Sequence, residues 1–278
     1  MKKVAFIYDF DKTLCDRDMQ EYSLIPDLGY ETPGVFWKEV DQIAREQDMD
    51  NISAYLFMLK KKFEESGRPL TREAFDGIGS SINLYPGVET WFSRVNEFAR
   101  SYGLEAEHYI ISSGMDEILE QTSVAREMKK IYACRYYYDE SGHAAWPAVI
   151  VNYTTKTQYL FRINKQVLEE RNEADLNTWV PMNQRPIPFE RMIYIADGLT
   201  DVPCMKLVRA NGGRSIAVYN PNSAKAGLTA RRLLDEQRAN FMAESDYSEG
   251  GTMEHLIQMI LEEMSAHSKL EDLEGIVQ

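Results

Sequence analysis

Short apolar runs recur along the chain, and segments with helical spacing of apolar residues separate them. The runs predict buried strands at 4–8, 109–111, 192–196, 215–219 and 241–243. Apolar residues repeat every three or four positions at 88–98, and 223–238 and 253–264 also have the pattern of helices. Buried strands that alternate with helices favour an α/β fold, with a parallel sheet covered on both faces.

Two stretches interrupt this alternation. Residues 15–84 contain no strand-like run but show helical spacing around Phe36 and again around Tyr55, which predicts a helical insertion after the first strand. Pro86-Gly87 then marks the return to the main domain. We therefore assign 1–16 and 85–278 to an α/β core domain and 17–84 to a helical domain. The second stretch, 131–153, predicts a strand followed by a turn at 139–142 and a small β-hairpin.

Composition excludes several classes of function. The chain has a formal net charge of -13 and no cluster of five or more Lys or Arg, so nucleic acid and anionic membranes are poor partners. No apolar run is long enough to predict a membrane span. Three widely spaced cysteines, without a CxxC pair, indicate reduced thiols in a cytoplasmic protein. Four histidines show no ligand spacing. The oligomeric state cannot be read from these features.

Polar side chains gather at the predicted strand ends, where open α/β sheets bind their ligands. Crowded carboxylates repel one another, and a divalent cation would relieve that cost. Oxygen ligands without His or Cys favour Mg²⁺. A hydroxyl, main-chain N–H groups and a lysine are suited to holding a phosphoryl group. The residues are Asp9, Asp11 and Thr13 after the first strand, Ser112, Ser113 and Gly114 after the second, Lys156 at a helix start, and Asp197 and Asp201 after the strand at 192–196.

The order of these motifs, DxDxT, strand-Ser, Lys and DGxxD, resembles the haloacid dehalogenase-like (HAD) superfamily of phosphohydrolases. The position of the helical insertion resembles the phosphoserine phosphatase-like branch. The resemblance implies a Rossmann-like core with a cap domain at 17–84. It implies that Asp9 is the nucleophile that forms an aspartyl phosphate, and that Asp11 is the general acid and base.

The resemblance also implies the remaining roles. Thr13 would hold the loop in shape, and Ser112 would bind the phosphoryl oxygens together with the N–H groups of Ser113 and Gly114. Either serine could fill the motif position, and we favour Ser112. Lys156 would neutralise Asp9 and the phosphate, and we favour it over Lys165 because it lies nearer the helix start. The implied Mg²⁺ ligands are Asp9, Asp11 through its main-chain carbonyl, Asp197, and Asp201 through water or from behind the direct ligands.

A cap excludes water and selects the leaving group, so we expect a small phosphorylated metabolite as substrate. In the resembled branch a cap carboxylate recognises the substrate amine, and Asp18 or Glu21 could match it. The hairpin and the segment 172–189 depart from compact members of the branch and put serine phosphate in doubt. Asp11 argues against dehalogenase chemistry. A phosphotransferase, or a non-catalytic binding protein that retains the fold, are the alternatives; intact Asp9, Asp11, Lys156 and Asp197 argue against the latter.

Overall fold

A computed structural model describes residues 1–273 and contains a seven-stranded sheet with the order β4-β3-β2-β1-β5-β6-β7. Neighbouring strands pair in parallel except β3 and β4, which are antiparallel. This confirms the predicted α/β fold, and each predicted run lies within a strand. The strands are β1 (Lys2–Tyr8), β2 (Leu104–Met115), β3 (Lys130–Tyr138), β4 (Ala144–Val149), β5 (Met192–Ala196), β6 (Arg214–Tyr219) and β7 (Phe241–Glu244).

Strand β2 is much longer than its apolar run predicted. Its pairing with β3 shifts register between Ile111 and Met115. Ser112, Ser113 and Gly114 therefore belong to the irregular end of the strand, whereas the sequence placed them after it. Polar residues can lie inside this strand because irregular pairing releases some of their main-chain groups from the ladder.

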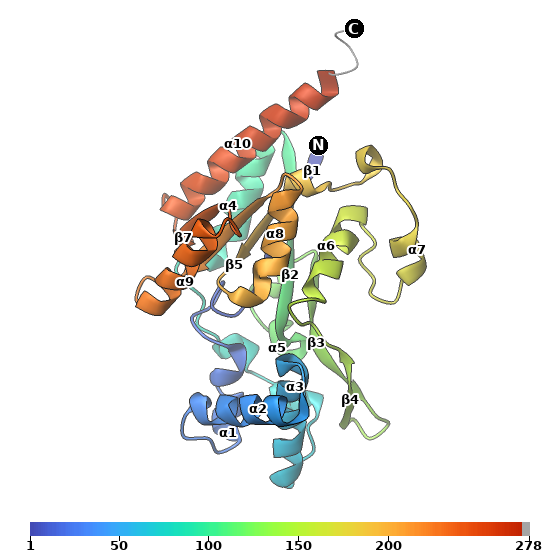
Figure 1. The fold of residues 1–278 in the computed structure, drawn as a ribbon, viewed down its shortest axis with the longest axis vertical. Coiled ribbons are helices and arrows are strands. Elements are labelled where there is room, and N and C mark those ends of the chain that lie inside the picture. Colours follow the sequence, from blue (N-terminus) through green and yellow to red (C-terminus); the bar gives the residue numbers. More distant parts are fainter. Residues whose placement is uncertain (274–278) are drawn as a thin grey trace.

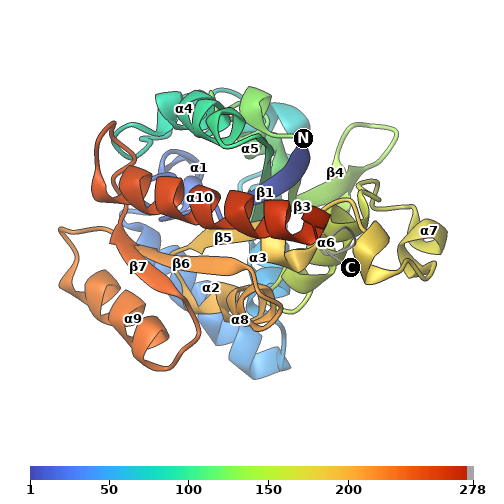
Figure 2. The same ribbon diagram turned by 90° about the horizontal axis from the view of Figure 1, so that it is seen from above.

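Helices cover both faces of the sheet (Figure 2). On one face α4 (Val88–Ser101) and α10 (Thr252–Leu273) pack together, and on the other α6 (Lys156–Lys165) packs against α8 (Val202–Ala210). Helix α9 (Ala224–Asp235) lies against β6 and β7. Helix α4 buries the predicted apolar face, and the indole N–H of its Trp91 donates to the Tyr8 hydroxyl at 3.0 Å. This buried bond ties the helix to the strand that leads into the site.

The segment between β1 and α4 is helical, as predicted. It contains α1 (Leu24–Asp27), α2 (Pro33–Gln47) and α3 (Asn51–Glu65), which lie beyond the end of the sheet opposite the N-terminus (Figure 1). Proline at the first turn starts α2, and the Asp50 side chain accepts the N–H groups of Ile52 and Ser53 to start α3. The two ends of the segment meet through an antiparallel bridge between Cys15 and Leu84.

The predicted hairpin forms β3 and β4 and supports the helical segment. The Ala144 N–H donates to the Leu70 carbonyl oxygen at 2.7 Å, and the Tyr136 hydroxyl donates to the Leu56 carbonyl of α3. The short helix α5 (Asp116–Leu119) follows β2, and α7 (Glu173–Asn177) lies in the long connection to β5. The three cysteines are buried and unpaired. Within residues 1–273, no helix combines the length and apolar character that crossing a bilayer requires.

Candidate active site

Strands β1 and β5 place Asp9 beside Asp197. Tyr8 pairs in register with Ile195, and the Asp9 N–H extends the ladder by donating to the Ile195 carbonyl at 3.0 Å. The Thr13 hydroxyl accepts the Asp197 N–H at 3.1 Å, which links the loop after β1 to the loop after β5. The geometry therefore agrees with the predicted function of Thr13 in holding the loop.

Lys156, the first residue of α6, is buried between two carboxylates. Its Nζ lies 3.1 Å from Asp9 Oδ1 and 2.7 Å from Asp201 Oδ1. Burial lowers the pKa of Lys156, but the charges of Asp201 and Asp9 outweigh burial and raise the pKa, so the ammonium is retained. The alternative, Lys165, lies at the other end of α6 and donates to the carbonyl oxygens of Leu176 and Thr178.

Asp201 is fully buried and both of its carboxylate oxygens are bonded to protein groups. Besides Lys156, the Tyr194 hydroxyl donates to Oδ1 at 2.5 Å and the Thr200 hydroxyl donates to Oδ2 at 3.0 Å. These bonds fit a residue that orients Lys156 and stands behind the direct ligands of a cation. Sequence reasoning missed Tyr194, because inside an apolar strand it resembles any other core aromatic residue.

The carboxylates fit a divalent cation. Asp9, Asp197 and Asp201 each offer an oxygen, and the three atoms lie within 4.8 Å of one another. Burial raises the pKa of Asp9 to about 7, and the nearby Asp201 charge adds to the effect although Lys156 opposes it. The pKa of Asp197 is also raised, by burial and then by the charges of Asp9 and Asp201. Bringing a cation here would offset that repulsion, and an all-oxygen donor set suits Mg²⁺.

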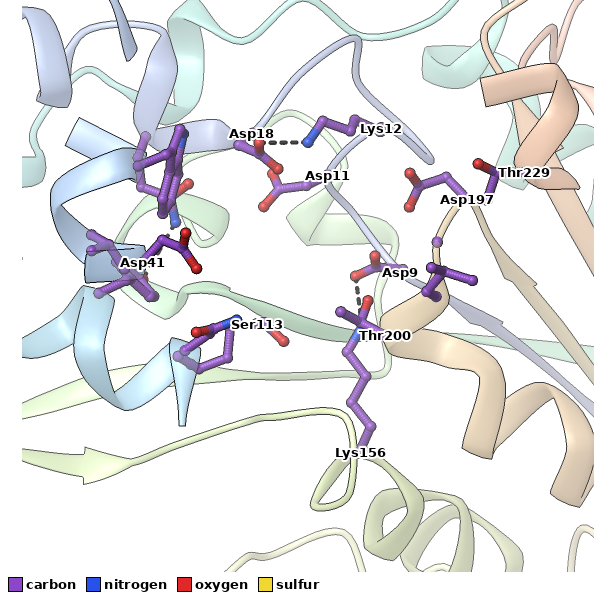
Figure 3. A pocket seen from close by; sticks show the side chains of 18 residues that line it. Asp9, Asp11, Lys12, Asp18, Asp41, Ser113, Lys156, Asp197, Thr200 and Thr229 are labelled. Carbon is purple, nitrogen blue, oxygen red and sulfur yellow. Dashed lines mark hydrogen bonds and ion pairs between the residues drawn. The ribbon is translucent and has the colours of Figure 1, made fainter. Parts of the chain in front are cut away.

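Asp11 stands apart from this carboxylate cluster. Its Oδ1 accepts the Met19 N–H at 2.8 Å, which fixes its side chain toward the helical segment. Burial, followed by the charges of Asp18 and Asp9, raises its pKa well above the ordinary value. Figure 3 shows Asp11 between Asp9 and the Asp18–Lys12 pair. A buried carboxyl with a raised pKa can hold a proton at neutral pH, as a general acid requires.

The two serines at the end of β2 have different surroundings. Ser112 is fully buried, and its Oγ accepts the Gly114 N–H at 3.0 Å. Ser113 lines the cavity described below, and its buried Oγ has no hydrogen-bond partner among residues 1–273. Gly114 allows close packing, because a Cβ there would lie 2.1 Å from the Met19 methyl group. The structure thus places the unsatisfied hydroxyl on Ser113, although the sequence favoured Ser112.

These groups surround a cavity of about 490 Å³ between the sheet edge and the helical segment. Figure 3 shows Lys156 reaching Asp9 from one side while Asp11 and Asp197 stand on the other. The helical segment supplies the facing wall, which includes the aromatic residues Trp37 and Tyr55. Its lining residues are Asp18, Gln20, Trp37, Val40, Asp41, Asn51, Ile52 and Tyr55.

The two carboxylates suggested for amine recognition both have internal partners. Asp18 lines the cavity but accepts from Lys12 Nζ at 2.5 Å. Glu21 is not among the described residues that line the cavity, and its Oε1 accepts the Trp37 indole N–H at 2.8 Å. Sequence reasoning missed Lys12 and Gln20. Lys12 stands inside the DxDxT motif, and Gln20 stands between the candidate acids Asp18 and Glu21 in the sequence. No sequence pattern indicates that the amide of Gln20 lacks a partner.

Comparison with known proteins defines the fold. No model of a protein family matches the chain. An uncharacterized protein of Borreliella burgdorferi is 26% identical over 277 residues, covering 89% of this chain and 92% of that protein. The solved structure of a HAD family hydrolase from Salmonella enterica serovar Typhi has a TM-score of 0.59 at 17% identity, over 92% of this chain and 71% of that chain.

Phosphoserine phosphatases are similar in fold as well. A substrate-bound phosphoserine phosphatase complex has a TM-score of 0.55 at 16% identity, over 87% of this chain and 93% of that chain. A probable phosphoserine phosphatase from Vibrio cholerae has a TM-score of 0.57 at 12% identity, over 96% of this chain and 67% of that chain. The chain therefore has the fold of HAD hydrolases. Within that class it resembles the phosphoserine phosphatases, as the motifs and the helical insertion predicted.

Proposed function

We propose that this protein is a phosphatase that hydrolyses small phosphate monoesters through an aspartyl phosphate on Asp9. The observation that carries the proposal is the shared cavity. One buried lysine, the carboxylates of Asp9 and Asp197, and the separate carboxyl of Asp11 all border the same space. The HAD fold and its phosphatase relatives support hydrolysis as the reaction.

In the first step the Asp9 carboxylate attacks phosphorus, and the bond from phosphorus to the leaving oxygen breaks. Lys156, 3.1 Å from Asp9, offsets the negative charge that gathers there. Asp11 gives its proton to the leaving oxygen. One of its oxygens is held by the Met19 N–H, so the other is free to carry that proton.

In the second step a water molecule attacks the phosphorus of the aspartyl phosphate and gives a proton to Asp11. Inorganic phosphate leaves, and Asp9 is regenerated. Asp9 and Asp197 would hold Mg²⁺, with Asp201 behind them and the Asp11 main-chain carbonyl as the further predicted ligand. When bound, the cation would neutralise the crowded carboxylates and the incoming phosphoryl charge.

We further propose that residues 17–84 act as a cap domain over a core of 1–16 and 85–278. The pairing of Cys15 with Leu84 brings the two connections together at one place, where a hinge could lie. A covered cavity of this size favours a small phosphorylated metabolite over a phosphoprotein.

The proposal is tested with an aryl phosphate in the presence of Mg²⁺. The parent protein is expected to release inorganic phosphate, and EDTA or Asp9→Asn is expected to abolish release. Addition of Mg²⁺ after chelation should restore it in the parent alone. Turnover that survives both EDTA and Asp9→Asn would contradict the mechanism, and an inactive parent would favour a binding protein with the same fold.

A further inference from the structure

The wall formed by the helical segment has one buried polar group whose bonding capacity is unused. Gln20 lines the cavity and is only 3% exposed. Its Nε2 donates to the Tyr55 hydroxyl at 3.3 Å, and its Oε1 has no hydrogen-bond partner among residues 1–273. An unsatisfied amide at such depth is costly, and a ligand in the cavity can relieve that cost.

The position of Gln20 is fixed by its neighbours. Met19 donates its N–H to Asp11, and its side chain packs against Gly114 at the end of β2. Tyr55 holds the amide from the other side. Gln20 therefore follows directly after the residue whose N–H holds the proposed general acid, and Gln20 and Asp11 line the same cavity.

The charged groups of the same wall already have partners. Asp18 is paired with Lys12, and Asp41 is paired with Arg45 one helical turn away. Glu21 is not among the described residues that line the cavity, and its carboxylate accepts the Trp37 indole N–H. Both carboxylates that line this wall, Asp18 and Asp41, are already in ion pairs, whereas the amide oxygen of Gln20 has no hydrogen-bond partner among residues 1–273.

An amide matches a hydroxyl group better than a charged group. The amide oxygen and nitrogen could exchange places, and either arrangement leaves one polar atom for the ligand. A hydroxyl satisfies both arrangements because it can donate and accept. The rings of Trp37 and Tyr55, whose centroids are 6.0 Å apart, provide an apolar surface for the carbon atoms beside that hydroxyl.

We propose that Gln20 determines substrate specificity by hydrogen-bonding a hydroxyl group on the leaving group. This inference rests on the proposed phosphatase function and adds a substrate class to it. The substrates are phosphate monoesters of small hydroxylated molecules, and esters of amino alcohols are poor substrates. The cavity of about 490 Å³ is large enough for a small phosphate monoester.

The test uses matched esters that differ in one group: 2-hydroxyethyl, ethyl and 2-aminoethyl phosphate. A corresponding series with three-carbon leaving groups tests how far from the phosphate the recognised group can lie. The parent protein, supplied with Mg²⁺, is expected to show kcat/KM at least about tenfold higher for a hydroxylated ester than for the alkyl and amino esters of the same length. Gln20→Met keeps the side-chain length. It is expected to remove this preference, so that kcat/KM falls about tenfold more for the hydroxylated ester than for the alkyl ester.

Gln20→Glu supplies a second variant in case the first does not fold. Its carboxylate is expected to shift the preference toward the amino ester by about tenfold or more relative to the parent. Preference of the parent for the amino ester, or equal loss on all three esters in Gln20→Met, would overturn the inference and leave the phosphatase intact. No turnover of these esters or of an aryl phosphate would contradict the proposed function, and with it this inference.

Discussion

The two walls of the cavity differ in how their charges are arranged. One wall, here called the core wall, is formed by the strand ends and the start of α6. On it Lys156 is bonded to Asp9 and Asp201, and Asp197 stands beside them, so charges from three segments face a common space. On the helical wall, the acids are paired with local partners and a neutral amide is left unsatisfied. The core wall is suited to chemistry on a phosphoryl group, and the helical wall is suited to choosing its leaving group.

The difference also shows which buried charges a fold tolerates. On the core wall, burial and then neighbouring negative charges raise the pKa values of Asp9 and Asp197, which is a cost to stability unless a cation or substrate shares the site. The helical wall avoids that cost because its charges are paired or exposed.

Asp11→Asn should separate chemistry from binding. The amide cannot deliver a proton to the leaving oxygen, so kcat is expected to fall by up to about 10⁴-fold. Inhibition by inorganic phosphate should change by less than about threefold, because Asp11 is not among the carboxylates clustered around the proposed cation site. Steady-state kinetics and product inhibition measure the two quantities.

Asp41→Asn is the matched control on the helical wall. Asp41 also lines the cavity, but it is paired with Arg45 and its side chain is 49% exposed. We expect kcat to change less than about tenfold, since an exposed pair contributes little. Equal losses in turnover and phosphate binding in Asp11→Asn would remove its proposed role.

Lys156→Met should lower the free energy of unfolding as well as the activity. The change leaves Asp9 and Asp201 buried without their cation, and breaking such a pair costs about 3–5 kcal/mol of unfolding free energy. Urea denaturation in the absence of Mg²⁺ measures the loss. Lys165→Met, at the other end of the same helix, removes bonds to two carbonyl oxygens and should cost about 1 kcal/mol. Similar losses in the two variants would show that the buried pairing is unimportant.

The two serines of β2 provide a sharper test within the core wall. The free hydroxyl of Ser113 is expected to bond a phosphoryl oxygen, and such a charged hydrogen bond contributes about 1.5–3 kcal/mol, or roughly 10- to 100-fold in kcat/KM. Ser112→Ala should cost less in kcat/KM because Ser112 is fully buried and is not among the described residues that line the cavity. A larger loss in Ser112→Ala than in Ser113→Ala would favour Ser112, as the sequence predicted.

Asp116, at the first position of α5, tests buried charge away from both walls. Burial raises its pKa to about 7, with the Glu120 charge adding and Arg135 opposing. The folded state then binds this proton more tightly than the unfolded state, so stability falls as pH rises from about 4 to 7. Asp116→Asn should therefore raise the free energy of unfolding by up to about 4 kcal/mol at pH 8 and by almost nothing at pH 4. Urea denaturation at the two pH values checks this; equal effects would contradict the raised pKa.

Much of the core wall could be predicted from the sequence because strand ends are local signals. Asp9 follows five apolar residues, Asp197 follows another such run, and parallel strands bring their carboxyl ends to one edge. The structure confirms the sheet and the helical insertion. It also brings together Asp9, Lys156, Asp197 and Asp201 from three separate segments.

The helical wall could not be predicted in the same way. Whether Asp18 is free depends on where the Lys12 side chain reaches, and no pattern along the chain encodes that contact. Gln20 became informative only because its depth and missing partner are tertiary properties. The choice between Ser112 and Ser113 depended on the irregular end of β2, which apolar periodicity does not reveal.

The most direct test of the account is to trap the phosphoryl group on the protein. A ³²P-labelled ester is mixed with protein and Mg²⁺, quenched in acid during turnover, and digested to locate the label by mass spectrometry. We expect acid-stable, base-labile label on the peptide that contains Asp9, and none in Asp9→Asn. Label on another residue, or rapid turnover by the parent without any label on Asp9, would contradict the proposed nucleophile.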